Sequence, residues 1–251
     1  MTAPPLRRGE RVTLLAVLAL LLLWTLLPAI RQPSEYHAFA DQRSLLGIPN
    51  AADVLSSVAF VAVGLLGLLR LHGRTRPAFP VPQASLDAFF LGLLLTGVGS
   101  VYYHLHPTDA TLVWDRLPLS IALAGVSGAA FTMRISRRAG LAILLAMLVL
   151  GPASVLFWAV TGDVSLYFLV QGGLMAGLLA LLLLTPRGDD SFPWWALVIW
   201  YAVAKAAEFG DALVWQATSR LIGGHAIKHV AAALGALAIA NALRPRETVG
   251  A

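Results

Sequence analysis

Apolar segments of about 20 residues recur along the chain, separated by short polar breaks. A helix needs about 20 apolar residues to cross the roughly 30 Å hydrocarbon core of a bilayer. Strands of a membrane barrel are shorter and alternate apolar with polar residues over about 10 positions. The pattern therefore predicts an all-α membrane protein with eight transmembrane helices. These are expected at residues 12–30, 52–71, 86–105, 112–133, 140–160, 164–185, 193–210 and 223–243.

Composition excludes an ordinary soluble protein. The chain of 251 residues is 58% hydrophobic and only 12% charged, whereas a soluble domain carries about 25% charged residues. It contains no cysteine, so it has neither disulfides nor thiolate metal ligands. The net charge of +5 comes from arginines clustered at segment ends. This placement indicates membrane topology and contact with anionic lipid headgroups, and does not indicate nucleic-acid binding.

The arginines also predict the orientation of the chain. One side of the eight-span arrangement carries Arg7, Arg8, Arg11, Arg70, Arg74, Arg76, Arg134, Arg137, Arg138, Arg187, Arg244 and Arg246. The other side carries only Arg31, Arg43, Arg116 and Arg220. Because positive residues are enriched in cytoplasmic loops, both termini are expected in the cytoplasm.

Three regions are predicted. Residues 1–51 form an N-terminal span and outer loop, residues 52–243 form a seven-helix catalytic membrane domain, and residues 244–251 form a cytoplasmic tail. The first span can also be read as a signal peptide. Its apolar run is long for one, and no A-x-A-like cleavage site follows it, which favours a retained helix.

Polar residues converge at one depth of the predicted bundle. Ser100 and His104 are four residues apart near the end of one span, and Asp115 lies near the start of the next. His225 and His229 are four residues apart at the start of the last span, so they share one helix face. Under the predicted topology all five lie in the outer leaflet. A single intramembrane histidine is more often a packing residue than a ligand, but this convergence predicts a metal site.

The donor set favours zinc. His225 and His229 can hold one ion between them, and His104 from another helix would complete a three-histidine site. Three protein ligands with an open fourth position are typical of catalytic zinc. His106 points to a different face from His104 and is left out. His37 and His72 are expected to be solvated loop residues.

Four charged residues lie near this site: Lys205, Glu208, Asp211 and Lys228. One interpretation is ion pairing, with Lys205 bound to Glu208 and Lys228 bound to an acid on the neighbouring helix, because unpaired charges are costly in hydrocarbon. The other is that they support and orient His225 or His229. Nearby aromatic residues, including Trp194, are expected to anchor the chain at the membrane interface.

The motifs Ser100-x3-His104, Asp115 and His225-x3-His229 resemble those of the alkaline ceramidase family, within a superfamily of seven-helix membrane hydrolases that includes adiponectin-type receptors. The resemblance implies zinc bound by the three histidines, Asp115 positioning and deprotonating the attacking water, and Ser100 near the substrate carbonyl oxygen. It implies cleavage of ceramide or a related N-acyl lipid to a fatty acid and an amine. A membrane lipid substrate is thus expected, with no obligate protein partner.

The chain departs from the family at two places. The acidic calcium-binding segment is represented by residues 35–43, where only Glu35 and Asp41 are acidic, so calcium control is not expected. A Ser-Asn pair on the first core helix is replaced by Ser56 and Ser57. The additional N-terminal span looks like that of bacterial members, which implies a bacterial inner membrane.

Two other functions remain open. Paired histidines on membrane helices can ligate haem in an electron-transfer bundle, although His-x3-His on one helix disfavours it. Alternatively, the buried lysines and acids can form the polar relay of a receptor or transporter. No inverted repeat supports a transporter.

Overall fold

The computed structural model describes residues 5–73, 81–185 and 192–243, and within these ranges the chain is helical with no strand. The helices are α1 (Arg8–Leu26), η1 (Ser34–His37), α2 (Ala51–His72), α3 (Gln83–Leu105), α4 (Asp109–Arg134), α5 (Arg137–Thr161), α6 (Ser165–Leu184), α7 (Trp194–Phe209), α8 (Asp211–Ala217) and α9 (Gly224–Ala242). The all-α prediction is confirmed for these residues.

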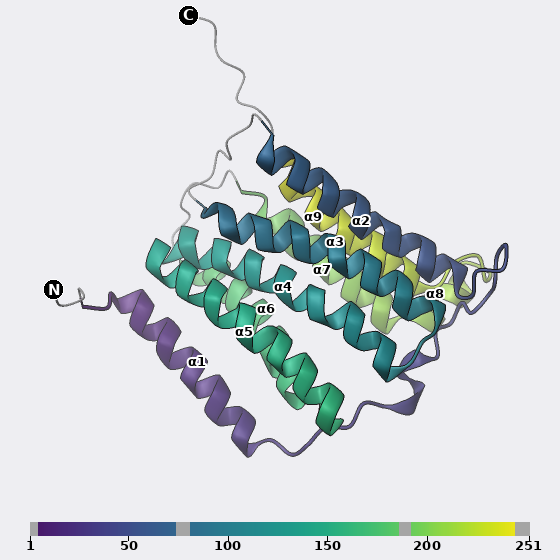
Figure 1. Ribbon diagram of the computed structural model, residues 1–251, viewed down its shortest axis with the longest axis horizontal. Coiled ribbons are helices and arrows are strands. Elements are labelled where there is room, and N and C mark those ends of the chain that lie inside the picture. The colour runs from purple at the N-terminus through teal and green to yellow at the C-terminus, as the bar shows by residue number, and fades with distance from the viewer. Residues whose placement is uncertain (1–4, 74–80, 186–191, 244–251) are drawn as a thin grey trace, which may run out of the picture.

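The helices form a bundle to which α1 is only loosely attached. Helix α3 packs between α2 and α4, α5 packs on α4, and α9 packs between α2 and α7. Figure 1 shows α2 to α5 side by side, with α6, α7 and α9 behind them and α1 standing apart at one edge. Because α3 ends where α2, α4 and α9 begin, one end of the bundle gathers four helix termini.

Small residues permit the close approach of α3 and α4. A Cβ atom on Gly92 would overlap the backbone of Ala122, and one on Gly125 would overlap the backbone of Phe89. Membrane helices commonly use small residues in this way, because dispersion contacts replace the hydrophobic effect as the source of helix association. The two backbones are therefore held in close register along most of their length.

Six helices, α1 to α6, have the length and apolar composition needed to cross a membrane. Helix α7 is short for a span at 16 residues. Helix α9 is 19 residues long but carries two histidines and a lysine. The chain thus has the character of an integral membrane protein, and α7 and α9 are treated as spans in the proposal below.

Some boundaries and elements differ from the sequence predictions. Helix α1 was expected at 12–30 but ends at Leu26, because Leu27 is extended and precedes Pro28. The sequence pattern missed α8 and η1, which are too short to give a periodic signal. The predicted tail at 244–251 and the arginines at 74, 76, 187, 244 and 246 lie outside the described residues.

Candidate metal centre

Three buried histidines meet at the end of the bundle where the helix termini gather. His104 comes from α3, and His225 and His229 come from α9. One ring nitrogen of each lies within 4.8 Å of the others. Nitrogen ligands about 2.0–2.1 Å from a tetrahedral zinc are about 3.3 Å apart. The three nitrogens therefore have to approach one another by up to about 1.5 Å to surround one ion.

Helix α9 begins with a cap supplied by another helix. The residue before it, Gly223, has no side chain, so the first backbone N–H groups need another acceptor. The Asp211 carboxylate accepts from the backbone N–H of His225 at 2.9 Å and from that of Ala40, also at 2.9 Å. Asp211 therefore fixes the helix turn that carries His225, and ties the loop around residue 40 to it.

His104 sits in the last turn of α3 and is fully buried. The Asn50 side-chain amide donates to its backbone carbonyl at 2.9 Å, which satisfies one of the carbonyls left free at a helix end. Among the described residues, neither ring nitrogen of His104 has a hydrogen-bond partner. Buried polar atoms in native proteins are nearly always partnered, so this imidazole has the environment expected of a metal ligand.

The imidazoles are covered by Phe39 from the loop before α2. Its ring centroid lies 4.8 Å from that of His104 and 4.4 Å from that of His225. The Phe39 side chain is itself buried. This loop therefore shields the histidines from bulk water at the end of the bundle.

Ser100 and Asp115 lie together beside the histidines. The Ser100 hydroxyl lies near the Asp115 carboxylate. Gly99 makes this possible, because a Cβ atom there would overlap the carbonyl of Trp114, the residue before Asp115. The glycine lets α4 approach α3 at the turn where the two polar side chains meet.

Three of the four charged residues form the ion pairs expected of the first interpretation, and Lys228 also touches His225. Lys205 Nζ lies 2.6 Å from one Glu208 oxygen, and Lys228 Nζ lies 3.1 Å from the other. Lys228 Nζ is also 2.9 Å from His225 Nε2. Together with the Asp211 cap, these contacts link the charged group to a candidate ligand.

Two serines of α2 lie beside His229, and their spacing in the sequence predicted no such role. The Ser56 hydroxyl donates to the Asp53 carbonyl at 3.1 Å and lies 2.9 Å from His229 Nδ1. An Nδ1–H that donates to Ser56 leaves the Nε2 lone pair free for a metal. The Ser57 hydroxyl lies 3.1 Å from that of Ser100. The adjacent serines were visible in the sequence, but nothing in it showed which helix face they occupy.

Three side chains outside the cluster refine the expectations. His106 is exposed, in agreement with its exclusion. His37 was expected to be solvated, but its ring lies 2.8 Å from the Tyr103 hydroxyl and 3.1 Å from Asp109. Trp194, expected at the membrane interface, is 2% exposed and stacks on Phe192.

The loop at residues 35–43 contains a bidentate ion pair. Arg43 donates through Nε and Nη2 to the two Asp41 oxygens, both at 2.8 Å. These hydrogen bonds hold the pKa of the buried Asp41 carboxyl below its ordinary value of 3.8. The Arg43 guanidinium also stacks on Trp215, 4.6 Å from the ring centroid. Asp41 is thus already paired with a cation from its own chain.

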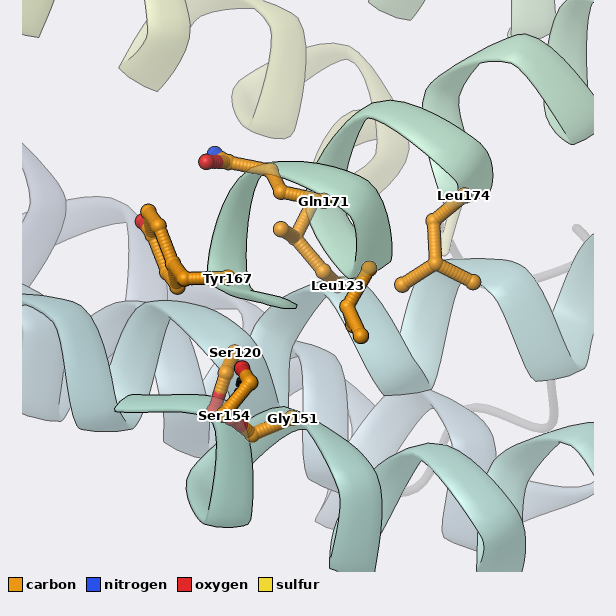
Figure 2. Close-up of a pocket in the computed structure, with 8 residues that line it drawn as sticks. Ser120, Leu123, Gly151, Ser154, Tyr167, Gln171 and Leu174 are labelled. Atoms are coloured by element: carbon orange, nitrogen blue, oxygen red, sulfur yellow. Dashed lines mark hydrogen bonds between the residues drawn. The ribbon is translucent and has the colours of Figure 1, made fainter. Parts of the chain in front are cut away.

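A small cavity lies at a different place, among α4, α5 and α6. Figure 2 shows Ser120, Ser154, Tyr167 and Gln171 converging on it. Its volume is about 10 Å³, about the least that holds one water molecule. It is too small for a lipid headgroup and is not part of the histidine cluster.

Comparison with known proteins adds no assignment: no family model and no curated protein matches this chain.

Proposed function

We propose that the protein is an integral-membrane zinc-dependent hydrolase that cleaves the amide bond of ceramide or a related N-acyl lipid. The observation that carries the proposal is His104, a fully buried imidazole without a partner among the described residues, within ligand distance of His225 and His229. Neutral imidazoles in a dry site suit zinc, which would occupy the centre with an open fourth position. The motif likeness to alkaline ceramidases gives the substrate class.

Bound zinc would supply a Lewis acid and would activate water at neutral pH. Asp115 is the proposed general base, and would later return the proton to the leaving amine, a role typically worth about 10²- to 10⁴-fold. Asp115 lies near Ser100, which is one helical turn before the candidate ligand His104. Ser100 is the proposed donor to the developing oxyanion, a contribution of about 3 kcal/mol in other hydrolases.

We expect the substrate lipid to enter the bundle from the bilayer between α6 and α7. Among the described residues these neighbouring helices do not pack closely, unlike the pairs α3 with α4 and α7 with α9. The acyl chains of a substrate would lie between them and remain in the bilayer. With α7 and α9 counted as spans, the chain crosses the membrane eight times. The arginine distribution would then put both termini in the cytoplasm and the histidines toward the outer leaflet. The bacterial inner membrane is proposed from the likeness of the additional N-terminal span to bacterial members of the family.

The test combines metal analysis with lipid mass spectrometry on the purified full-length protein. We expect about one zinc per chain and release of fatty acid from ceramide. Asp115→Asn should keep the zinc and lose turnover. His104→Ala should lose both, whereas the matched control His106→Ala should lose neither. A metal-free parent protein, or an Asp115→Asn variant that hydrolyses as fast as the parent, contradicts the proposal.

The polar relay remains a second candidate because one contact chain favours it. Hydrogen-bonded groups run from Lys205 through Glu208 and Lys228 to His225. A receptor or proton-coupled transporter predicts uptake in vesicles without any lipid turnover. Haem is a poorer fit, because two of the three clustered imidazoles project from one face of one helix, whereas axial ligands approach from opposite sides. A Soret band in the purified protein would favour haem nonetheless.

A further inference from the structure

Helix α1 is fastened to the bundle at both of its ends. Near its start, Ser136 donates to the Glu10 carboxylate at 2.7 Å. Near its end, the Trp24 indole donates to Ser165 at 3.1 Å, and its ring packs edge-on against Phe157 with 5.5 Å between centroids. Between these two attachments α1 runs along the edge of the bundle, as Figure 1 shows, and Leu20 approaches Gly173 of α6.

The space between the attachments is a long apolar cavity of about 1120 Å³. Ligand pockets in proteins usually measure about 300–1,000 Å³. The cavity runs along α1 from Arg7 to Leu23, which at 1.5 Å per residue is about 24 Å. That length exceeds one leaflet, which is about half of the roughly 30 Å hydrocarbon core. The opposite wall comes mainly from α5 and α6, where Gly177 has open space around the position of a Cβ atom, whereas Gly173 faces Leu20 of α1.

One end of the cavity is chemically different from the rest. Arg7, Arg8 and Arg134 line it where α1 begins, together with the hydroxyl-bearing Thr13 and Thr185. Arg7 and Arg8 are both exposed. The nearby acid Glu10 is buried and bonded to Ser136. Cationic groups and hydroxyls thus border one end of the apolar cavity.

We propose that this cavity, which we call the α1 groove, binds one anionic glycerophospholipid. Its phosphate would lie among Arg7, Arg8 and Arg134, where guanidinium groups match phosphate geometry. Its acyl chains would lie between α1 and α6. Flexible chains can enter such a slot from the bilayer, whereas a helix from a second copy would have to break the attachments at Glu10 or Trp24. The inference is independent of the proposed hydrolase activity, because the groove contains none of the candidate site residues.

The chain offers a matched pair of glycines for the test. Gly177 lines the groove and has open space around the position of a Cβ atom, so Gly177→Leu fills the groove without a clash. Gly172 lies on the same helix with equally open space but does not line the groove, so Gly172→Leu is the control. For charge, Arg7→Gln with Arg8→Gln is compared with the exposed Arg137→Gln, which lies outside the lining residues.

The experiment is native mass spectrometry of delipidated full-length protein titrated with phosphatidylglycerol, phosphatidylcholine or a free fatty acid. We expect one phosphatidylglycerol per chain, bound at least tenfold more tightly than phosphatidylcholine. Gly177→Leu and the double arginine variant should lose at least tenfold in this affinity, and both controls should keep it. Unchanged binding in Gly177→Leu overturns the proposal. So does equal binding of the two phospholipids, preference for the fatty acid, or a dimer that binds no lipid.

Discussion

The Lys228 ammonium lies 2.9 Å from Nε2 of His225. An ammonium group has only donors, so it takes up the lone pair on that nitrogen. A metal ion that used the same nitrogen would have to displace Lys228. The displaced side chain has a partner ready, because it is already 3.1 Å from a Glu208 oxygen. A cation supplied by the protein thus stands where a metal cation is expected to bind.

Replacing Lys228 should strengthen metal binding. In Lys228→Met, the competitor for His225 and one nearby positive charge are both removed, while Glu208 keeps its pairing with Lys205. We expect zinc affinity to rise about tenfold, equivalent to about 1.4 kcal/mol, measured by competition with a chelator of known affinity. Lys205→Met is the control, since Lys205 contacts Glu208 but neither candidate ligand on α9. An affinity that stays equal or falls would show that Lys228 does not compete with the ion.

The sequence predicts the elements that depend on local pattern. Long apolar runs indicate helices wherever they occur, and eight of the nine α-helices within the described ranges coincide with predicted spans. The sequence also predicts that the three histidines lie close together. The i,i+4 spacing places His225 and His229 on one helix face, and the predicted topology places His104 at the same end of the bundle. The pairing of Lys205 with Glu208, and of Lys228 with an acid on the neighbouring helix, follows from the cost of unpaired charge in hydrocarbon.

What the sequence could not supply depends on helix rotation and on loop conformation. Helix α2 is apolar on all sides, so its pattern does not show that Ser56 faces His229. Phe39 lies in a loop more than 60 residues before His104, and no periodicity links the two. Asn50 takes a left-handed conformation with φ of 44°, which directs its side chain to the end of α3. Such contacts arise only when the helices are packed.

Ser56 should support metal binding through His229. Ser56→Ala removes the nearer of two hydroxyls beside His229 Nδ1, since Ser56 lies 2.9 Å and Ser57 3.3 Å from that nitrogen. Loss of such a partner typically lowers metal affinity about 10- to 100-fold. Ser154→Ala is the control, because Ser154 is also a membrane-helix serine but bonds only to the Gly151 carbonyl, away from the cluster. Chelator competition on the two variants gives the comparison. Equal zinc affinity in both would remove Ser56 from the support of the centre.

The close approach of α3 and α4 at Gly99 should be needed for both stability and turnover. Gly99→Ala places a methyl group against the Trp114 carbonyl and pushes Asp115 away from Ser100. Overpacking of this kind costs about 1–3 kcal/mol, or roughly 2–12 °C in melting temperature for a chain of this size. Gly172→Ala, where a Cβ meets open space, should melt within about one degree of the parent. Thermal unfolding in detergent measures the effect on stability, and a lipid-hydrolysis assay measures the effect on turnover. A Gly99→Ala protein with the melting temperature and turnover of the parent would refute this account of the contact.

The Asp41–Arg43 pair should give the loop before α2 a pH-dependent stability. The pKa of Asp41 is held below its ordinary value of 3.8 by hydrogen bonds from Arg43. A depressed folded-state pKa means that the contribution is fully present above about pH 3.8 and is lost as the pH falls through the lower folded-state value. Asp41→Asn removes the titrating group, so the parent should melt above the variant at pH 7, and the difference should shrink below pH 3.8. Glu35→Gln, which changes an exposed acid in the same loop, serves as the control at each pH. A difference in melting temperature that stays constant from pH 7 to pH 2.5 would mean that Asp41 stabilises the loop by its shape and not by its charge.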